Sequence, residues 1–190
     1  MLARILSILV DFVGSFFVYL LLVRFHFQWL RAPFHNQAGE FVIACTNWIV
    51  KPARRVVPAV FGLDLASLAA AWLLQIVCLA LLLMVAGNDL SSSPGIAFGV
   101  LAGISLVDLM QYSLRILMFV VILQAVLSWV NPYNPLQPLL DALTRPFLKP
   151  IRRFVPPLAN VDLSPLILIV IVLILHEPLA ELRVLVRGLF

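Results

Sequence analysis

The sequence predicts an all-α integral membrane protein. Its four transmembrane helices are expected to form two parallel two-helix repeats, each with an interfacial amphipathic helix. Three observations lead to this prediction: an apolar composition, four long apolar runs and a basic segment that occurs twice. Of the 190 residues, 63% are hydrophobic and 12% are charged, whereas soluble domains contain about 45–50% apolar and about 25% charged residues. Because too few polar side chains remain to cover a water-soluble globule, a membrane protein is predicted.

The basic balance of the chain points to lipid rather than to nucleic acid. The formal net charge is +4, and a soluble basic domain could use such a charge to bind nucleic acid. Here the basic residues cluster beside apolar runs, where anionic lipid headgroups lie. No nucleic-acid partner is therefore expected. The two cysteines, Cys45 and Cys78, are too few for a disulfide framework.

The first half of the chain contains two apolar runs of spanning length. Residues 5–29 and 65–86 each suffice, because about 20 residues cross the hydrocarbon core. The first run lacks a cleavage site of small residues and is expected to be an uncleaved span. Arg24, near the end of this run, is expected to extend towards the headgroups, and Trp29 to lie in the interfacial aromatic belt.

The third apolar region, residues 96–130, corresponds to about 52 Å of helix, more than the ~30 Å core. It is either one tilted helix or two helices that meet near Asp108. Glycines at every fourth position predict close helix packing, namely Gly95, Gly99 and Gly103. The region closes with Trp129, the second expected interface anchor.

The fourth apolar run, residues 163–175, is short for a span. Continuation to about residue 186 would make it long enough, but would place Glu177 inside the membrane.

Each long loop is expected to contain an interfacial helix. Residues 40–50 place Phe41, Cys45, Trp48 and Ile49 on one helical face, in a segment too short and polar to span. Residues 139–148 form the corresponding helix in the second loop. Pro52 and Pro58 are expected to stop regular helix and to hold the intervening arginine pair in a constrained turn, and a basic turn is likewise expected after residue 148.

The basic segment predicts an internal duplication. Lys-Pro-Ala-Arg-Arg-Val-Val-Pro at 51–58 recurs as Lys-Pro-Ile-Arg-Arg-Phe-Val-Pro at 149–156. Nine positions between 46–65 and 144–163 are identical, including Asp64 and its counterpart 98 residues later. With a two-residue gap, Arg24 aligns with Gln124 and Asp11 with Gln111. We predict a first repeat at 1–87, an extracytoplasmic turn at 88–95 and a second repeat at 96–190.

Two spans per repeat place both basic loops on one side, and the positive-inside rule makes that side cytoplasmic. One interpretation of the basic residues is that they set topology and bind anionic headgroups. The alternative is that they dock an acidic partner, since the prolines that bracket both pairs favour a fixed shape. The candidate lipid- or partner-binding residues are Lys51, Arg54, Arg55, Lys149, Arg152 and Arg153.

Four polar residues are candidates for an intramembrane role: Asp11, Asp108, Gln111 and Arg115. They lie either in water at the projecting end of a long helix, or in an interior cluster that seals helix packing or lines an ion path. Because four spans make only a small pore, a channel would require oligomers.

The second copy of the basic segment reads Thr-x-Pro-x-Leu-x-Pro-Ile-Arg-Arg-x-x-Pro from Thr144, followed by Asp-x-Ser-Pro from Asp162. This pattern resembles that of the YggT (YlmG) family of small multi-pass membrane proteins. The first copy departs from it at Trp48, at Ala53 and at residues 66–67. The resemblance implies links to cell division, to osmotic or potassium tolerance, or, in plastids, to assembly of haem-bearing cytochrome b, and it implies no catalytic residue.

No motif typical of an enzyme is present, and the expected function is not enzymatic. His26, His35 and His176 are too scattered to predict a metal site, and no cofactor is expected. The plastid relatives allow an axial haem role for His26 or His176, but helix-end histidines at the interface are favoured. The preferred function is a scaffold or assembly factor of the bacterial inner membrane, with anionic lipids, a membrane protein or a second copy as partners. The alternative is an oligomeric transport or osmoregulatory protein.

Overall fold

The protein is all-helical throughout the residues that its computed structural model describes, 1–34, 36–57, 63–87, 94–131, 134–155 and 162–188. The side chains of Trp129 and Arg187 are also outside the description. In chain order the helices are α1 (Leu2–Trp29), α2 (Gln37–Val56), α3 (Leu65–Val85), α4 (Pro94–Val130), α5 (Gln137–Phe154) and α6 (Ser164–Arg187).

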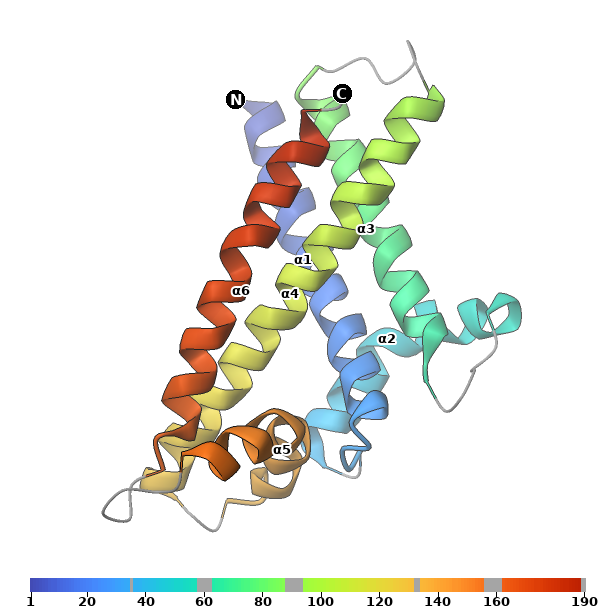
Figure 1. Ribbon diagram of the computed structural model, residues 1–190. Helices are drawn as coiled ribbons and strands as arrows, with labels where there is room; N and C mark the ends of the chain where they lie inside the picture. Colours follow the sequence, from blue (N-terminus) through green and yellow to red (C-terminus); the bar gives the residue numbers. More distant parts are fainter. Residues whose placement is uncertain (35, 58–62, 88–93, 132–133, 156–161, 189–190) are drawn as a thin grey trace.

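Four of these helices, α1, α3, α4 and α6, are long and apolar enough to cross a membrane by length and composition. They form a bundle in which both chain termini lie at one end (Figure 1). The shorter helices α2 and α5 lie at the opposite end, across the direction of the bundle (Figure 1). The prediction of an all-α multi-pass membrane protein is therefore confirmed.

The two uncertain spans are each one continuous helix. Helix α4 comprises 37 residues without a break at Asp108 and runs obliquely through the bundle (Figure 1). Helix α6 continues through Pro178 to Arg187, which places Glu177 on its exposed surface. A proline inside a spanning helix is tolerated because neighbouring groups and local adjustments satisfy the freed carbonyl.

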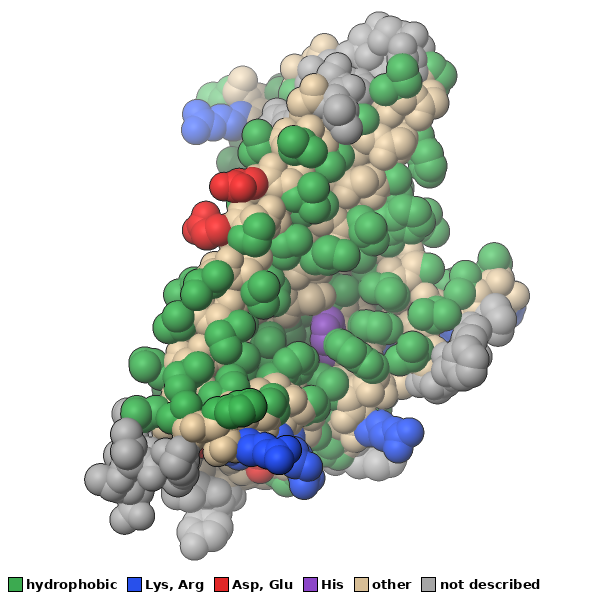
Figure 2. Space-filling model, viewed as in Figure 1, with side chains coloured by type: hydrophobic (Ala, Val, Ile, Leu, Met, Phe, Trp, Pro, Cys, Tyr) green, Lys and Arg blue, Asp and Glu red, His purple; other side chains and the backbone are tan. Residues whose placement is uncertain are grey.

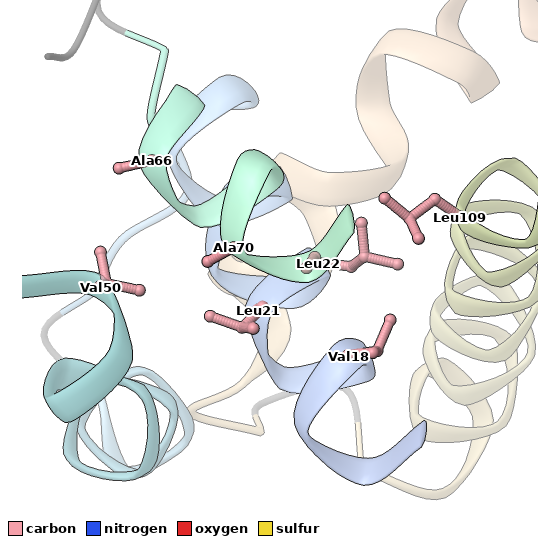
Figure 3. Packing of buried hydrophobic residues seen from close by; sticks show 8 residues of the cluster. Val18, Leu21, Leu22, Val50, Ala66, Ala70 and Leu109 are labelled. Atoms are coloured by element: carbon pink, nitrogen blue, oxygen red, sulfur yellow. The ribbon is translucent and has the colours of Figure 1, made fainter. Parts of the chain in front are cut away.

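Helices α1 and α3 pack closely through small residues. Leu21 and Leu22 of α1 contact a surface of α3 that carries Ala66 and Ala70, and Leu109 of α4 closes the cluster (Figure 3). Small side chains on α3 allow the two backbones to approach, and van der Waals packing is a main source of helix association in lipid.

The closest glycine contact lies outside the predicted glycine series. A Cβ atom at Gly14 of α1 would lie 2.3 Å from Cys78 Sγ of α3. By contrast, Gly95 and Gly99 have nothing within 4 Å of that position, and only Gly103 meets a neighbour, Val186 of α6 at 3.2 Å. The prediction of close packing at Gly95 and Gly99 was wrong, because both glycines lie on the exposed side of α4, whereas Ala97 between them is buried.

The prediction that Pro52 ends the first interfacial helix was also wrong. Helix α2 continues through Pro52 to Val56, so the Arg54–Arg55 pair is helical. Helix α5 likewise contains Pro146 and Pro150, and its arginine pair is helical rather than in a turn. These prolines are exposed, so the carbonyls that lose an intrahelical bond can be solvated.

Helices α2 and α5 each end two residues before the last proline of the basic segment. Val57 and Val155 leave the helix with φ −114° and −122° and extended ψ values. The residue before a proline is restricted to such conformations. Pro58 and Pro156 themselves lie outside the described residues.

Candidate functional site

An ion pair joins the end of α2 to the start of α3. Arg54 Nη2 donates to Asp64 Oδ2 at 2.8 Å and Arg54 Nε donates to Oδ1 at 3.3 Å. Asp64 is completely buried at the N-terminus of α3, where Ser67 Oγ donates to its Oδ2 at 2.6 Å. Arg24 Nε of α1 lies 3.5 Å from the same oxygen. We call Arg24, Arg54, Asp64 and Ser67 the first junction.

Arg24 is an interior residue and does not extend to the headgroups as predicted. Only 6% of it is exposed, and its Nη1 donates to Thr46 Oγ1 at 2.8 Å and to Asn47 Oδ1 at 3.0 Å. Snorkelling is favoured for a cation that otherwise faces hydrocarbon. Here α2 and Asp64 provide oxygen acceptors inside the protein, so the guanidinium is satisfied in place.

A second ion pair occupies the matching position between α5 and α6. Arg152 Nε donates to Asp162 Oδ2 at 2.9 Å, and the backbone N–H of Ser164 donates to Asp162 Oδ1 at 2.9 Å. We call Arg152, Asp162 and Ser164 the second junction. Its carboxylate is more accessible than that of Asp64, with 35% of the side chain exposed.

The difference between the junctions follows from one substitution. Gln124 of α4 stands at the position that aligns with Arg24, and it accepts a hydrogen bond from Thr144 Oγ1 at 2.5 Å. Its Nε2 donates to Asp141. The neutral amide of Gln124 bonds to the buried Thr144 and, unlike the guanidinium of Arg24, needs no buried counter-ion. Asp162 therefore has one arginine partner, whereas Asp64 has two.

Both carboxylates are held ionised. Burial by itself raises the pKa of Asp64, but the hydrogen bonds from Arg54 and Ser67 and the charges of Arg54 and Arg24 bring the pKa below its usual value. Burial also raises the pKa of Asp162, and the bonds from Ser164 together with Arg152 lower this pKa below its usual value. Each junction therefore contains a permanent ion pair at neutral pH.

The remaining basic candidates are exposed. Lys51, Arg55, Lys149 and Arg153 lie on the surfaces of α2 and α5. Figure 2 shows basic side chains at the end of the bundle where α2 and α5 lie, below a largely hydrophobic surface along the helices. Of the six predicted binding residues, Arg54 and Arg152 are used in the junctions, and the other four face outwards.

The polar candidates of the spans separate into two groups. Asp108 is 3% exposed, and Gln75 Nε2 donates to its Oδ2 at 2.8 Å while Arg183 Nε donates to its Oδ1 at 2.5 Å. Gln111 is also buried. Asp11 and Arg115 are exposed.

Arg115 lies seven residues after Asp108 on α4 and makes contacts separate from the Asp108 ion pair. Its Nε lies 3.4 Å from His176 Nε2, and its guanidinium is 5.7 Å from the ring of Tyr112. The structure therefore joins α3, α4 and α6 through Asp108, Gln75 and Arg183, and brings neither Asp11 nor Arg115 into that cluster of hydrogen bonds.

Three residues of these ion pairs received no role in the sequence analysis. Asp64 and Asp162 were recognised as identical in the two copies but received no role, although each follows an identical arginine by ten residues. That shared spacing was the available signal. Arg183 carried no comparable signal, because its partner Asp108 is 75 residues away.

The other candidates receive less support. Trp29, the expected interface anchor at the end of α1, is half exposed, and the side chain of Trp129 is outside the described residues. His35 also lies outside them. Among the residues that are described, no group of three or more His, Cys, Asp or Glu side chains could hold a metal ion.

Comparison with known proteins agrees with the family resemblance of the basic segment. The CCB3/YggT family model matches residues 3–85 and 103–183. An uncharacterised protein of Pseudomonas aeruginosa is 33% identical over 156 residues, which is 81% of this chain and 77% of that protein. The uncharacterised protein YggT of Escherichia coli K12 is 30% identical over 178 residues, covering 93% of this chain and 89% of the relative. No solved structure matches.

Proposed function

Because the chain belongs to the CCB3/YggT family of membrane proteins, we propose that it acts as a non-enzymatic scaffold or assembly factor in the bacterial inner membrane. In this proposal it presents two equivalent basic surfaces to anionic headgroups and to an acidic region of a membrane or cytosolic protein. We define the first surface as Lys51 with Arg55 and the second as Lys149 with Arg153.

The observation that carries the proposal is the pair of junctions. Each fixes the basic end of a short helix to the next span through an arginine–aspartate pair. The neighbouring Lys and Arg residues are thereby held exposed on a helix of defined position. Setting topology would require only positive charge, whereas recognition of a partner benefits from charges that are already ordered. The matching contacts also support an origin by internal duplication.

The proposed orientation places both basic surfaces in the cytoplasm. Apolar side chains near the basic ones are exposed on α2 and α5, among them Trp48, Val56 and Phe154. A helix with exposed apolar and basic side chains is suited to the headgroup layer of an anionic membrane. A reporter fused after Phe190 should read outside the cytoplasm, and a cytoplasmic reading would overturn this orientation.

Site-specific photocrosslinking tests the docking function. A photoreactive residue at Arg55 or at Arg153 should capture anionic lipid and one shared protein, because both surfaces face the same compartment. Leu166 of α6 is exposed and apolar, so the same probe at Leu166 serves as the matched control and should capture lipid alone. Capture at Arg55 should weaken when Lys51→Glu reverses the adjacent charge. Recovery of lipid alone from both basic surfaces would remove docking and leave a topological role.

The buried Asp108 supports one second candidate, an oligomeric transport or osmoregulatory protein. Ionisable residues inside spans often mark ion paths. In this chain, however, both carboxylate oxygens of Asp108 accept hydrogen bonds, from Gln75 and Arg183, which favours a packing role. Potassium flux into liposomes that contain the purified protein, lost in Asp108→Asn, would support transport, and absence of flux in the unmodified protein would eliminate it.

A further inference from the structure

A hollow among the spans surrounds the side chain of His26. Three adjoining cavities of about 740, 470 and 210 Å³ each include His26 in their linings. The largest lies among α1, α3, α4 and α6, and its walls include Trp29, Trp72 and Leu179. Figure 2 shows a histidine between hydrophobic side chains on one face of the bundle. The size falls in the range of about 300–1,000 Å³ that is usual for ligand pockets.

The hydrogen bonding of His26 defines what the hollow can accept. Its Nδ1 lies 2.7 Å from the carbonyl oxygen of Leu22, which can only accept, so Nδ1 carries the proton. In the neutral ring Nε2 is then a bare acceptor. Neutrality is expected because His26 is half-buried among mainly apolar side chains, where a cation without a counter-ion is costly. Across the described part of the chain, no donor is placed on Nε2.

The ring of His26 is fixed by its neighbours. It meets the edge of Phe25 with ring centroids 5.5 Å apart and lies 5.9 Å from the ring of Trp29. Together with the Leu22 bond, these contacts hold the imidazole in one orientation. An acceptor that is fixed before a ligand arrives loses little freedom on binding.

The second polar group of the hollow is also an acceptor. Ser113 Oγ lines the same two cavities as Trp29, and it donates its proton to the carbonyl oxygen of Leu109 at 2.9 Å. Its lone pairs remain available. Trp72, a further polar-tipped side chain of the largest cavity, donates its Nε1–H to the carbonyl oxygen of Ala102 at 3.1 Å. The described linings also carry donors, namely the indole of Trp29 and, in the cavity of about 470 Å³, Tyr19 and Arg115. His26 and Ser113 are thus acceptors in a mostly apolar wall that also offers donors.

We propose that this hollow binds a membrane-soluble alcohol or phenol, whose hydroxyl donates to His26 Nε2 and whose hydrocarbon part fills the apolar space. A ligand group with acceptors alone, such as a quinone carbonyl, would leave His26 Nε2 without a hydrogen bond, whereas a hydroxyl can donate to His26 and accept from a donor in the wall. Water is a poor occupant, because a buried water requires two to four polar partners. The ligand class is therefore a hydrogen-bond donor on a hydrocarbon body, either aliphatic or aromatic.

Tryptophan fluorescence provides a direct test, since Trp29 and Trp72 line the cavity. The other two tryptophans, Trp48 and Trp129, are replaced by Phe in the purified full-length protein. The probes are a brominated long-chain alcohol and a brominated alkylphenol, each paired with its methyl ether, which can no longer donate. Bromine quenches tryptophan on contact, so binding appears as saturable quenching, and the two pairs distinguish the aliphatic from the aromatic source.

The unmodified cavity should bind at least one hydroxyl probe about fivefold more tightly than the corresponding ether, the factor for one hydrogen bond of about 1 kcal/mol. His26→Phe should abolish this preference. His176→Phe, the same change at a histidine whose Nε2 bonds to Arg115, should retain it. Ala69→Phe, which fills the wall of the cavity, should remove saturable quenching without altering His26.

Equal affinity for alcohol and ether in the unmodified cavity would overturn the proposal, and this result does not depend on whether any cavity variant folds. Quenching that never saturates would do so as well, because it indicates contact with bulk lipid. Retention of the hydroxyl preference in His26→Phe would assign the hydrogen bond to another residue and overturn the role of His26.

Discussion

Arg54 and Asp64 bind each other across the loop that joins α2 to α3, with a buried carboxylate facing a guanidinium that is 44% exposed. Arg24 approaches the same carboxylate from α1 with only 7% of its side chain exposed. Asp64 thus compensates one buried cation and one partly solvated cation. Its counterpart Asp162 compensates only Arg152, whose side chain is 49% exposed.

We expect Asp64→Asn to destabilise the protein much more than Asp162→Asn. Loss of the charge at Asp64 leaves Arg24 buried without a counter-ion, and breaking a buried pair in this way costs about 3–5 kcal/mol. The exposed pair at Asp162 is worth about 1 kcal/mol or less. Asparagine keeps a side-chain oxygen that can still accept from Ser67 Oγ at the first junction and from the Ser164 N–H at the second, so the comparison mainly tests the charge. Unfolding in mixed micelles measures both losses, and equal losses would refute the difference between the junctions.

We also expect acid to weaken both junctions. The pKa of each carboxylate is lowered in the folded protein from an ordinary value of 3.8, so each contributes stability that is present above that value. This stability is lost as the pH falls below about 4 towards the folded pKa. Thermal unfolding between pH 7 and pH 3 should show the decline below pH 4. In Asp64→Asn the decline should be shallower, and an unchanged slope would mean that other carboxylates dominate.

The positions of the spans could be predicted from sequence, whereas the partners of their polar residues could not. A span is a local property, because about 20 apolar residues in succession define it. The environment of Arg24 depends on Thr46, 22 residues later, and on the path of α2 across α1. Positive charge near the end of an apolar run predicts snorkelling, and nothing local reveals that α2 covers this residue.

The basic residues were predicted as a group, but the sequence did not predict which of them bind an aspartate of this chain and which face outwards. Sequence identity between the two copies identified Arg54, Arg152, Asp64 and Asp162 together. Whether an arginine binds an external anion or an aspartate of its own loop depends on how α2 and α5 end. The prolines at positions 52 and 150 suggested an earlier end than the structure has, and this misplaced both arginines in turns.

Substitution of Gly14 should show whether a glycine contributes to stability through close helix packing, by comparison with a glycine that has no close neighbour. Gly14→Ala places a Cβ atom 2.3 Å from Cys78 Sγ, so the Cys78 side chain or the two helices must shift, and overpacking of this kind costs about 1–3 kcal/mol. Gly99→Ala is the matched control, since nothing lies within 4 Å of its Cβ position. Unfolding in mixed micelles should show the loss only at Gly14. Adding Cys78→Gly should recover part of it, and failure of this rescue would locate the strain elsewhere.

The pair of Asp108 and Arg183 should behave as a coupled unit that joins α4 to α6. Asp108→Asn leaves Arg183 without this counter-ion, and Arg183→Gln leaves a buried carboxylate whose remaining hydrogen bond among the described residues comes from Gln75. Because the Asp108 side chain is 5% exposed and that of Arg183 is 40% exposed, the loss should be larger for Arg183→Gln, which strands the more deeply buried charge.

A double-mutant cycle for Asp108 and Arg183, measured by unfolding in mixed micelles, gives their interaction free energy. Residues in direct contact typically show coupling of about 0.5–3 kcal/mol, and the double variant should lose less than the sum of the single losses. Arg115→Gln is the control, because its recorded partners are His176 and the ring of Tyr112, so it should combine additively with Asp108→Asn. Additivity between Asp108 and Arg183 as well would show that the ion pair does not contribute to holding α6 on the bundle.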